Sequence, residues 1–565
     1  MVTPMKIHAL GTHSDWVYNG GAWGRAGHQR IADLTFAAGI RRLYWRTHNG
    51  GQAKYPSQVC TVEDGEVYRD PNFQGLGSLP KSYFAYAQYL DYRAWDQVAD
   101  MAEIGSAAGL EVCHWYTVFE DDHGGHLGSA FDRENPRFRC TLKTGKQISG
   151  CLDFWYPEVQ AHKLAVVDEL LEKPTSRLLL DFVRRNGQPS ADAAGNSRYG
   201  YNPEIQAGFR SETGLDALKI APGTPDWEAW LDYNARPLTG FLRQVKTRAA
   251  AKGVPVDVLV WAVDTRKWMA FDLVSIAREG LVEEILTGTH HYAFSAADAR
   301  RQVTRLREQL GDLPQPILPG LFAYSLISPL SVDEFTGEAA ALGCEAVVLH
   351  EANHLVECPL SDRLRAWTYD KPHCHREVVA TASGEAVNAG FIKCHDVFNE
   401  PCNQQTGFTA SHTADELVVT VTCHERNPGN LLPVPGLGSD NYNANELKAR
   451  AFWNPFESLH VLLDAAHDHE NYCHFVLDPA GEKLSEQRLD EDWAGVWHGE
   501  SRIGAAEWTA SFRIPWKTLG VTPEPGRILG LQLVRMQNSP REVSAWFCTT
   551  GRRMNPQEFG HLRLA

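Results

Sequence analysis

The regular alternation of short apolar runs with helical patterns over residues 1–370 limits the folds open to this chain more than any other feature. When a helical stretch follows each apolar run, the pattern predicts parallel strands joined by crossover helices. The eight candidate strands are Ile7–Gly11, Arg42–Arg46, Glu111–Tyr116, Arg177–Phe182, Val256–Val263, Glu283–Thr287, Pro316–Phe322 and Ala346–His350. This order predicts a (β/α)8 barrel of the TIM type. An open doubly wound sheet has a similar pattern, but the first loop lacks the glycine-rich signal of a nucleotide-binding fold.

The pattern changes near Lys371. Beyond this residue helical periodicity nearly vanishes, and short alternating strands such as Leu417–Cys423, Leu459–Asp464 and Trp508–Ile514 take over between Gly, Pro and Asn turns. Strands with this spacing are typical of an antiparallel β-sandwich. The sequence therefore predicts an α/β barrel domain over 1–370, followed by an all-β sandwich over 371–565.

The composition excludes some classes of partner. A formal net charge of -16 argues against nucleic acid and against an anionic membrane surface, because both require a basic face. No segment has the apolar length of a membrane span. Aromatic residues make up 10% of the chain, with 17 Trp, which suits a carbohydrate ligand but is also met in large β-rich cores. The sequence gives no indication of the oligomeric state.

The first residues and the cysteines bear on location. The start lacks a charged region, a long apolar region and a cleavage site, which favours the cytoplasm. A chain from which a leader had been removed would begin in the same way, so a secreted or periplasmic protein stays open. The 12 Cys form no CxxC pair, which favours reduced structural thiols.

Polar and aromatic side chains gather where the predicted strands end, which in a barrel of this type is where reactive groups lie. Four carboxylates at these positions are candidates for catalysis: Asp181, Asp264, Glu351 and Glu120. The residues expected to bind a substrate there are Trp45, Arg46, His114, Trp115, Arg184, Trp261, His290, His291, Tyr292, Tyr324 and His350. Such a set suits a sugar, because rings stack on its C–H faces and polar groups bond its hydroxyls.

Asp181 is the strongest of the four carboxylate candidates. It directly follows the apolar run Leu178–Leu180, so a charge lies where a buried strand emerges. The alternative interpretation is a loop cap that pairs with Arg184 or Arg185. Asp264 also follows an apolar run, and its alternative is a helix N-cap or an ion pair with Arg266.

The histidines admit a second interpretation as metal ligands. However, no HxH motif lies on the first strand, and no HExxH motif occurs anywhere in the chain. The pair His350 and His354 encloses Glu351 but lacks a recognised ligand spacing. We therefore predict neither a metal ion nor an organic cofactor.

The stretch from Arg177 to Arg185 resembles the fourth strand of glycoside-hydrolase-like family 10 barrels, in which an apolar strand ends in Asp-Phe and an Arg follows. Further stretches that fit the same family in the same order are Tyr199–Asp216, Trp230–Leu242 and Asp272–Glu283. The resemblance implies a TIM barrel with a presumed glycosidase activity. Related barrels carry a carboxylate nucleophile at the end of strand 4, which corresponds to Asp181, but the resemblance does not fix the partner carboxylate.

The C-terminal part resembles the carbohydrate-binding family 9-like sandwich. The resemblance rests on Gln404–Thr406, Leu417–Cys423, Val461–Asp464, Asp478–Gly481 and above all Glu507–Trp516. It implies a sandwich appended to an enzyme, with or without sugar binding of its own. Candidates for a stacking platform are Trp453, Trp493, Trp497 and Trp546, whereas Trp508 and Trp516 lie in strand-like patterns typical of a core.

The leading hypothesis is a glycoside hydrolase that acts on a polysaccharide or oligosaccharide, with Asp181 as nucleophile and Asp264 or Glu351 as acid. A polysaccharide lyase is the first alternative. In that case Arg46, Arg184 or Arg185 would bind a uronate, and a pair such as His291 and Tyr292 would abstract and return protons. The second alternative is a sugar-binding protein whose barrel has no catalytic activity.

Overall fold

The structure is a computed structural model. It describes residues 5–18, 23–37, 39–70, 75–76, 79–80, 87–122, 128–183, 200–288, 293, 295–321, 329–350, 377–381, 385–387, 391–393, 402–434, 437, 456–490, 493, 495–539, 541–546, 556 and 559–565. The chain divides into two compact units. The first consists of Met1–Gly75 and Lys81–Arg363, and the second consists of Leu76–Pro80 and Leu364–Ala565. The predicted domain boundary at residue 371 lies outside the described residues and stays a prediction.

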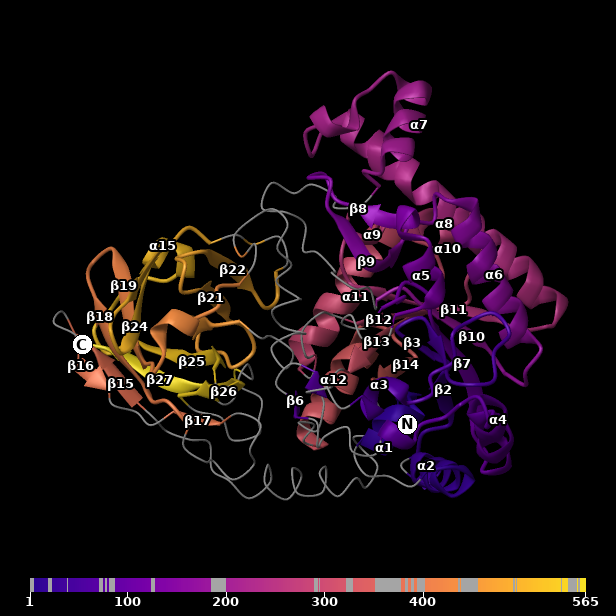
Figure 1. Cartoon of the computed structure of the whole chain (residues 1–565), viewed down its shortest axis with the longest axis horizontal. Helices are drawn as coiled ribbons and strands as arrows, with labels where there is room; N and C mark the ends of the chain where they lie inside the picture. Colours follow the sequence, from indigo (N-terminus) through magenta and orange to yellow (C-terminus); the bar gives the residue numbers. More distant parts are fainter. Residues whose placement is uncertain are drawn as a thin grey trace. The chain divides into compact units, whose positions relative to one another are not determined.

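The first unit contains a closed barrel of eight parallel strands, as the sequence predicts (Figure 1). The strands are β1 (Lys6–Gly11), β2 (Arg42–Arg46), β7 (Glu111–Thr117), β10 (Leu178–Asp181), β11 (Val256–Trp261), β12 (Ile285–Gly288), β13 (Ile317–Leu321) and β14 (Ala346–Leu349). They follow one another around the wall in chain order, and β1 closes the barrel by pairing with both β2 and β14. Each observed bound lies within two residues of its predicted position.

Helices follow the strands and lie outside the barrel wall (Figure 1). They are α1 (His13–Tyr18), α2 (Arg25–Ala37), α4 (Gln97–Ala107), α6 (Pro157–Leu171), α8 (Pro225–Ala251), α9 (Thr265–Met269), α10 (Leu273–Arg278), α11 (Ala296–Leu310) and α12 (Pro329–Ala341). Short elements in the loops include η2 (Ala87–Tyr89), α5 (Ala130–Glu134), β8 (Arg139–Thr141), β9 (Gln147–Leu152) and α7 (Pro203–Thr213). No helix in the described part of the chain is long and apolar enough to span a bilayer.

The barrel interior is filled by side chains rather than left as a pore. Alternate residues of a strand point to opposite faces, so one set from each strand faces inward. The apolar inward set is Leu10, Tyr44, Cys113, Trp115, Leu179, Leu259, Leu286, Leu318, Ala346 and Val348. These side chains separate the amino ends of the strands from their carboxyl ends.

Ion pairs close the amino end of the barrel. Arg177 donates to both carboxylate oxygens of Asp257 at 2.6 Å, and Arg42 contacts Glu284 at 2.7 Å and Glu111 at 2.6 Å. Burial raises the pKa of Asp257, although the Arg177 guanidinium acts in the opposite direction. Groups at this end of a TIM barrel serve stability, so the chemistry is expected at the other end.

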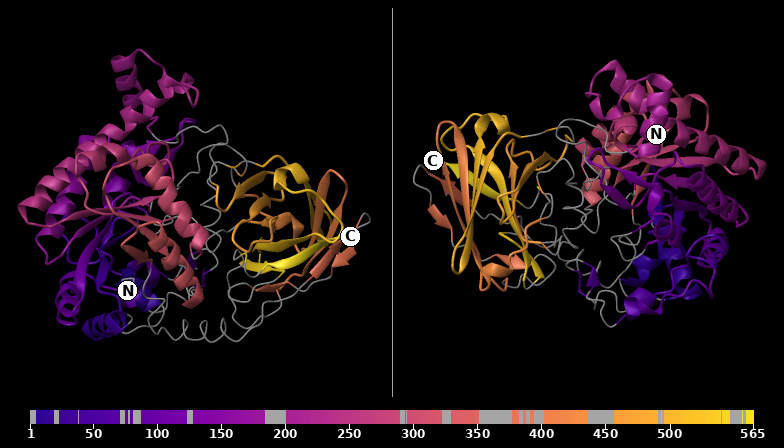
Figure 2. Two further views of the ribbon diagram at one scale, coloured as in Figure 1. Left: turned by 180° about the vertical axis from the view of Figure 1, so that it is seen from behind. Right: turned by 45° about the horizontal axis from the view of Figure 1, so that its top comes forward.

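The second unit is a sandwich of two sheets, which lie face to face in the right-hand view of Figure 2. The larger sheet contains β15 (Glu377–Ala380), β27 (Gly560–Leu564), β25 (Ile528–Asn538), β20 (Ser458–Asp464), β21 (Cys473–Leu477), β22 (Lys483–Gln487), β26 (Arg541–Ala545) and β17 (Ile392–Lys393). The smaller sheet contains β16 (Glu385–Val387), β18 (Thr406–His412), β19 (Glu416–His424), β24 (Glu507–Pro515) and β23 (His498–Ile503). The three strands predicted from alternation coincide with β19, β20 and β24.

The tryptophans of the sandwich lie mostly inside it. Trp508 and Trp516 belong to its core, as predicted. Trp497 and Trp546 are 3% and 1% exposed in the same core, so the prediction that they form a stacking platform is wrong. Their rings fill the space between the two sheets, where an indole buries more apolar area than any other side chain. Trp493 packs against the core from its edge, and Trp453 lies outside the described residues.

Candidate functional site

Asp181 is the last residue of β10 and is fully buried. One carboxylate oxygen, Oδ2, accepts a hydrogen bond from the indole Nε1 of Trp115 at 2.9 Å. The other, Oδ1, accepts one from the backbone N–H of Val183 at 2.8 Å. Because β10 pairs with β7 and β11 along its length, the position of this carboxylate is fixed by the barrel wall.

Trp115, which holds Asp181, also contacts a buried ion pair between Arg46 and Glu120. Its ring lies 5.2 Å from the guanidinium carbon of Arg46, the last residue of β2. Arg46 donates from Nη2 to Oε2 of Glu120 at 2.5 Å and from Nε to the carbonyl of His48 at 2.9 Å. Arg46 and Glu120 are 2% and 3% exposed, so this is a buried ion pair. Removing one partner of such a pair costs about 3–5 kcal/mol, because the other charge is left uncompensated.

His350 also contacts the indole of Trp115. It directly follows β14, is 5% exposed, and meets the indole edge to face at 5.6 Å between ring centroids. We call Arg46, Trp115, Glu120, Asp181 and His350 the Asp181 cluster. Its members lie at or just after the carboxyl ends of β2, β7, β10 and β14, which meet at one end of the barrel.

Two residues predicted to bind substrate lie on the other face of the wall. Trp45 neighbours Arg46 and therefore points outward, where its indole donates to Gln97 of α4 at 2.5 Å and its ring meets His28 of α2. His114 neighbours Trp115 and is likewise buried on the helix side, where burial lowers its pKa to about 4. The alternation of strand side chains separates both from the inward-facing Asp181 cluster, so these two predictions are corrected.

The predicted site residues at the end of β11 and after it make structural contacts. Trp261 is 5% exposed and packs in the core, with its ring 6.4 Å from that of Trp268. Asp264 is exposed, and its carboxylate accepts the backbone N–H of Lys267 at 3.2 Å as the N-cap of α9. Burial lowers the pKa of Arg266, but the carboxylates of Asp232, Glu228 and, least of these, Asp264 raise it overall. The capping alternative therefore describes Asp264 in this structure.

Several predicted site residues cannot be compared with the geometry in this way. Arg184, His290, His291, Tyr292, Tyr324 and Glu351 lie outside the described residues. Their roles stay predictions.

Sequence reasoning missed a buried ion pair formed by Asp121, the residue after Glu120 in the chain. Lys163 of α6 is 2% exposed and donates to both carboxylate oxygens of Asp121, at 2.8 and 2.7 Å. Burial raises the pKa of Asp121, against the effect of the Lys163 ammonium. A usable signal exists, because Lys163 lies in the same helical stripe as Val159 and Val167, and a lysine in an apolar stripe indicates a buried partner.

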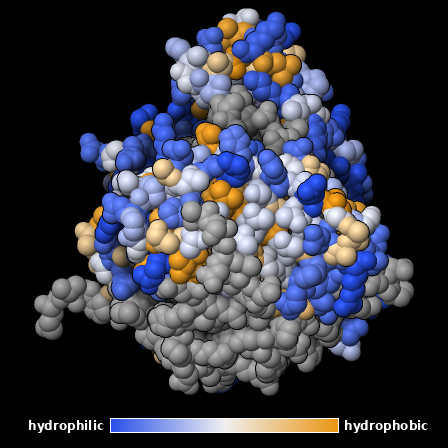
Figure 3. Space-filling view, turned by 90° about the vertical axis from the view of Figure 1, so that its left-hand side faces the viewer, coloured by the Kyte–Doolittle hydropathy of each residue, from blue (hydrophilic) through white to orange (hydrophobic). Residues whose placement is uncertain are grey.

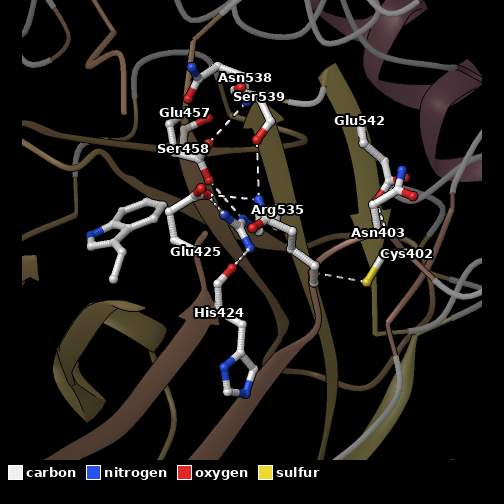
Figure 4. Close-up of polar contacts among 12 residues, drawn as sticks. Cys402, Asn403, His424, Glu425, Glu457, Ser458, Arg535, Asn538, Ser539 and Glu542 are labelled. Carbon is white, nitrogen blue, oxygen red and sulfur yellow. Dashed lines mark hydrogen bonds and ion pairs between the residues drawn. The ribbon is translucent and has the colours of Figure 1, made fainter. Parts of the chain in front are cut away.

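A comparable buried cluster in the sandwich joins its two sheets (Figure 4). Arg535 of β25 donates to Glu457 at 2.7 Å, to Glu425 at 2.9 Å and to the carbonyl of His424 at 3.0 Å. Glu457 also accepts the backbone N–H of Asn538 at 3.0 Å. The guanidinium is fully buried and its donors are used within the fold. We assign this cluster to holding the sheets together.

A hydrogen-bonded chain crosses three neighbouring strands of the larger sheet. Ser458 contacts His460 at 3.0 Å, His460 contacts His474 at 2.8 Å, and His474 contacts Glu486 at 2.6 Å. Each imidazole uses both ring nitrogens, so the chain links β20, β21 and β22 through their side chains as well as their backbones. Among the residues the structure describes, no group of three or more His, Cys, Asp or Glu is arranged to hold a metal ion.

The surface seen in Figure 3 has hydrophobic residues only as small separate areas among hydrophilic ones, within the coloured part of that face. A broad apolar area would indicate a protein or membrane interface.

The fold and the Asp181 cluster define a barrel protein with a buried carboxylate at the carboxyl end of its strands, joined to a β-sandwich.

No family model matches this chain, and no curated protein matches it. Similar solved structures include the PgaB (BpsB) glycoside hydrolase domain from Bordetella bronchiseptica, with 12% identity and a TM-score of 0.40, covering 64% of this chain and 98% of that one. The catalytic domain of β-amylase from Paenibacillus polymyxa has 10% identity and a TM-score of 0.40, over 62% and 94% of the two chains.

For the C-terminal part, a carbohydrate-binding module of family 9 from Caldicellulosiruptor kristjanssonii, in complex with cellotriose, has 17% identity and a TM-score of 0.23. This match covers 34% of the present chain and 93% of the module. Identities and TM-scores at this level assign no function to the chain. The resemblances to the two particular families therefore stay predictions.

Proposed function

We propose that the barrel is a glycoside hydrolase in which Asp181 is the carboxylate that acts on the anomeric carbon. The observation that carries the proposal is the fully buried Asp181 at the end of a barrel strand, with both oxygens accepting hydrogen bonds from N–H donors. A carboxylate fixed in this way stabilises an oxocarbenium-like centre without reorganising during the reaction.

The remaining members of the Asp181 cluster support this role. Trp115 holds the carboxylate through its N–H, and the Arg46–Glu120 pair lies against the same indole. Glu120 is engaged in a buried ion pair, and such a carboxylate is a poor proton donor. We therefore assign Glu120 to positioning Arg46 and Trp115, and we assign the acid of the reaction to Glu351, which follows His350 in the chain.

The decisive test compares Asp181→Asn with Asp264→Asn, a matched control in which the exposed cap of α9 is changed. Both proteins are assayed against a panel of polysaccharides and aryl glycosides, with products separated by chromatography. We expect Asp181→Asn to lose about 10³-fold in rate, or about 4 kcal/mol of transition-state stabilisation, while it remains folded. Asp264→Asn is expected to keep most of its activity, since its carboxylate caps a helix.

Near-normal turnover by Asp181→Asn would remove this residue from the mechanism. The products also decide between the reaction classes. New reducing ends without unsaturation indicate hydrolysis, whereas an ultraviolet-absorbing double bond indicates the lyase alternative. Binding without any product would leave the barrel as a sugar-binding protein.

A further inference from the structure

An exposed tryptophan lies at the carboxyl end of the barrel, outside the Asp181 cluster. Trp23 follows α1 in the loop after β1, and its side chain is 39% exposed. β1 is the neighbour of β2, the strand that ends in Arg46. Because the loops that follow barrel strands share one end, the loop that carries Trp23 lies at the same end of the barrel as Arg46.

Three aromatic rings support the indole of Trp23 from within. Its centroid lies 4.9 Å from His13, 5.0 Å from Trp95 and 5.5 Å from Tyr92. Tyr92 and Trp95 are nearly parallel to each other, at 22°. His13 is held in turn by a hydrogen bond between its Nδ1 and the Tyr92 hydroxyl, at 2.9 Å. Trp23 is therefore held in place although much of its surface meets solvent.

Exposed polar groups border this aromatic group. The indole N–H of Trp95 donates to Asp100, and Arg25 pairs with Asp100 and, at 2.9 Å, with Glu103. The side chains of Arg25 and Glu103 are 51% and 70% exposed. A flat apolar ring with charged hydrogen-bonding groups at its edge has the chemistry that binds a pyranose, whose C–H face is apolar and whose rim carries hydroxyls.

Two buried histidines lie close together next to Trp23. His13 and His28 are both fully buried, and their ring centroids are 5.0 Å apart. Among the described residues, Nε2 of His13 and both ring nitrogens of His28 have no hydrogen-bond partner. Buried polar atoms without a partner are rare and costly, and an enclosed water molecule is the usual partner of such atoms.

We propose that Trp23 is a sugar-binding subsite at the barrel rim, on which one neutral pyranose ring of the substrate stacks while Arg25 and Glu103 bond its hydroxyls. The proposal rests on the proposed glycosidase function only for the statement that this sugar belongs to the substrate. A neutral sugar fits better than a uronate, because the net charge is -16 and two carboxylates border the site. A second protein chain fits poorly, because one exposed indole offers far less surface area than the roughly 1,000 Å² that a specific interface buries.

Binding can be measured without any turnover. The full chain is labelled with 5-fluorotryptophan, and the ¹⁹F resonance of Trp23 is assigned as the one absent from Trp23→Phe. Cellotriose, maltotriose and xylotriose are then added in turn. We expect at least one trisaccharide to shift the Trp23 resonance, and Arg25→Ala to weaken that binding several-fold. If none of the three sugars shifts the resonance, the subsite does not exist.

Kinetics test whether the subsite serves the reaction. On an oligosaccharide that the protein cleaves, Trp23→Ala is expected to raise KM about tenfold with little change in kcat, and Trp23→Phe to recover part of the loss. Phe36→Ala is the control, because Phe36 is a similarly exposed ring, at 38%, on α2. An unchanged KM would overturn the assignment to substrate. A shifted resonance in a protein without hydrolase activity would keep the sugar site and reject the proposed function.

Discussion

Asp181 and Asp264 follow neighbouring strands of the barrel, and each comes after a run of apolar residues. Asp181 is the last residue of β10 and points into the barrel, where an indole and a backbone amide hold it. Asp264 comes three residues after β11 and already caps the next helix. The difference of three residues in position relative to the end of the strand separates these two roles. The sequence pattern that makes both residues candidates cannot distinguish them.

Arg46 provides a prediction about stability at the same scale. Arg46→Met should lower the free energy of unfolding of the barrel by about 3–5 kcal/mol, because Glu120 would stay buried without its partner. Replacing both residues, as Arg46→Met with Glu120→Leu, should recover much of the loss. Arg243→Met removes a pair that is exposed on both sides and should change stability by less than about 1 kcal/mol. Urea denaturation, monitored by hydrogen exchange of barrel peptides, measures the free energy of unfolding of each variant. A negligible effect of Arg46→Met would show that the pair is not buried.

His114 should make the stability of the barrel depend on pH. Burial lowers its pKa from 6.5 to about 4, so between these values the unfolded chain binds a proton that the folded chain does not. Stability is therefore lost as the pH falls from 6.5 towards 4, by up to about 3 kcal/mol from this residue. His114→Leu should reduce that pH dependence, whereas His498→Leu, at an exposed position, should leave it unchanged. Parallel slopes of stability against pH for the native chain and His114→Leu would contradict the prediction.

At the scale of elements, α6 is tied to the loop that carries Glu120. Lys163 reaches from the buried stripe of the helix to both oxygens of Asp121, and the backbone of Asp121 is held by Gly150 and Ser129. This ion pair fixes the residue directly after Glu120. The orientation of the Asp181 cluster therefore depends on a helix that contributes no member to it.

Lys163→Met tests this dependence. We expect a loss of about 3–5 kcal/mol in stability, since Asp121 would be a buried carboxylate without a counter-ion, and a fall in kcat larger than any change in KM. Lys246→Met removes a more exposed pair with Glu283 and serves as the control. A variant with lower stability but normal kcat under folding conditions would mean that α6 supports the fold without positioning the site.

The sequence predicts strands better than it predicts contacts. The apolar runs locate all eight barrel strands, because a parallel strand buried on both faces must be apolar along its length. The same reasoning predicts that both Trp45 and Arg46 bind substrate. Because the strand is pleated, Trp45 points towards the helices and Arg46 points into the barrel. Their directions depend on the register with neighbouring strands, which periodicity within one run does not contain. The pairing of Lys163 with Asp121 depends on tertiary packing in the same way.

At the scale of the whole molecule, the change of pattern along the chain corresponds to two separate cores. The barrel unit has an inner cluster around Trp115 and Leu259 and an outer one between wall and helices. The sandwich has its own cluster between its sheets, around Val461 and Phe512. Each unit thus buries enough apolar surface to fold around its own centre, as expected for a chain of 565 residues.

Separate cores lead to a prediction about the segment that joins them. Limited proteolysis of the native protein should cut first between about residues 365 and 380, where the change from helical to alternating periodicity places the boundary, and should leave two stable fragments. The C-terminal fragment from residue 371 should then unfold cooperatively on its own, because the Arg535 cluster and the sandwich core lie wholly within it. Mass spectrometry locates the cuts, and thermal unfolding of the purified fragment measures its independence. Resistance of this segment to protease, or a fragment without a cooperative transition, would mean that the two units depend on each other to fold.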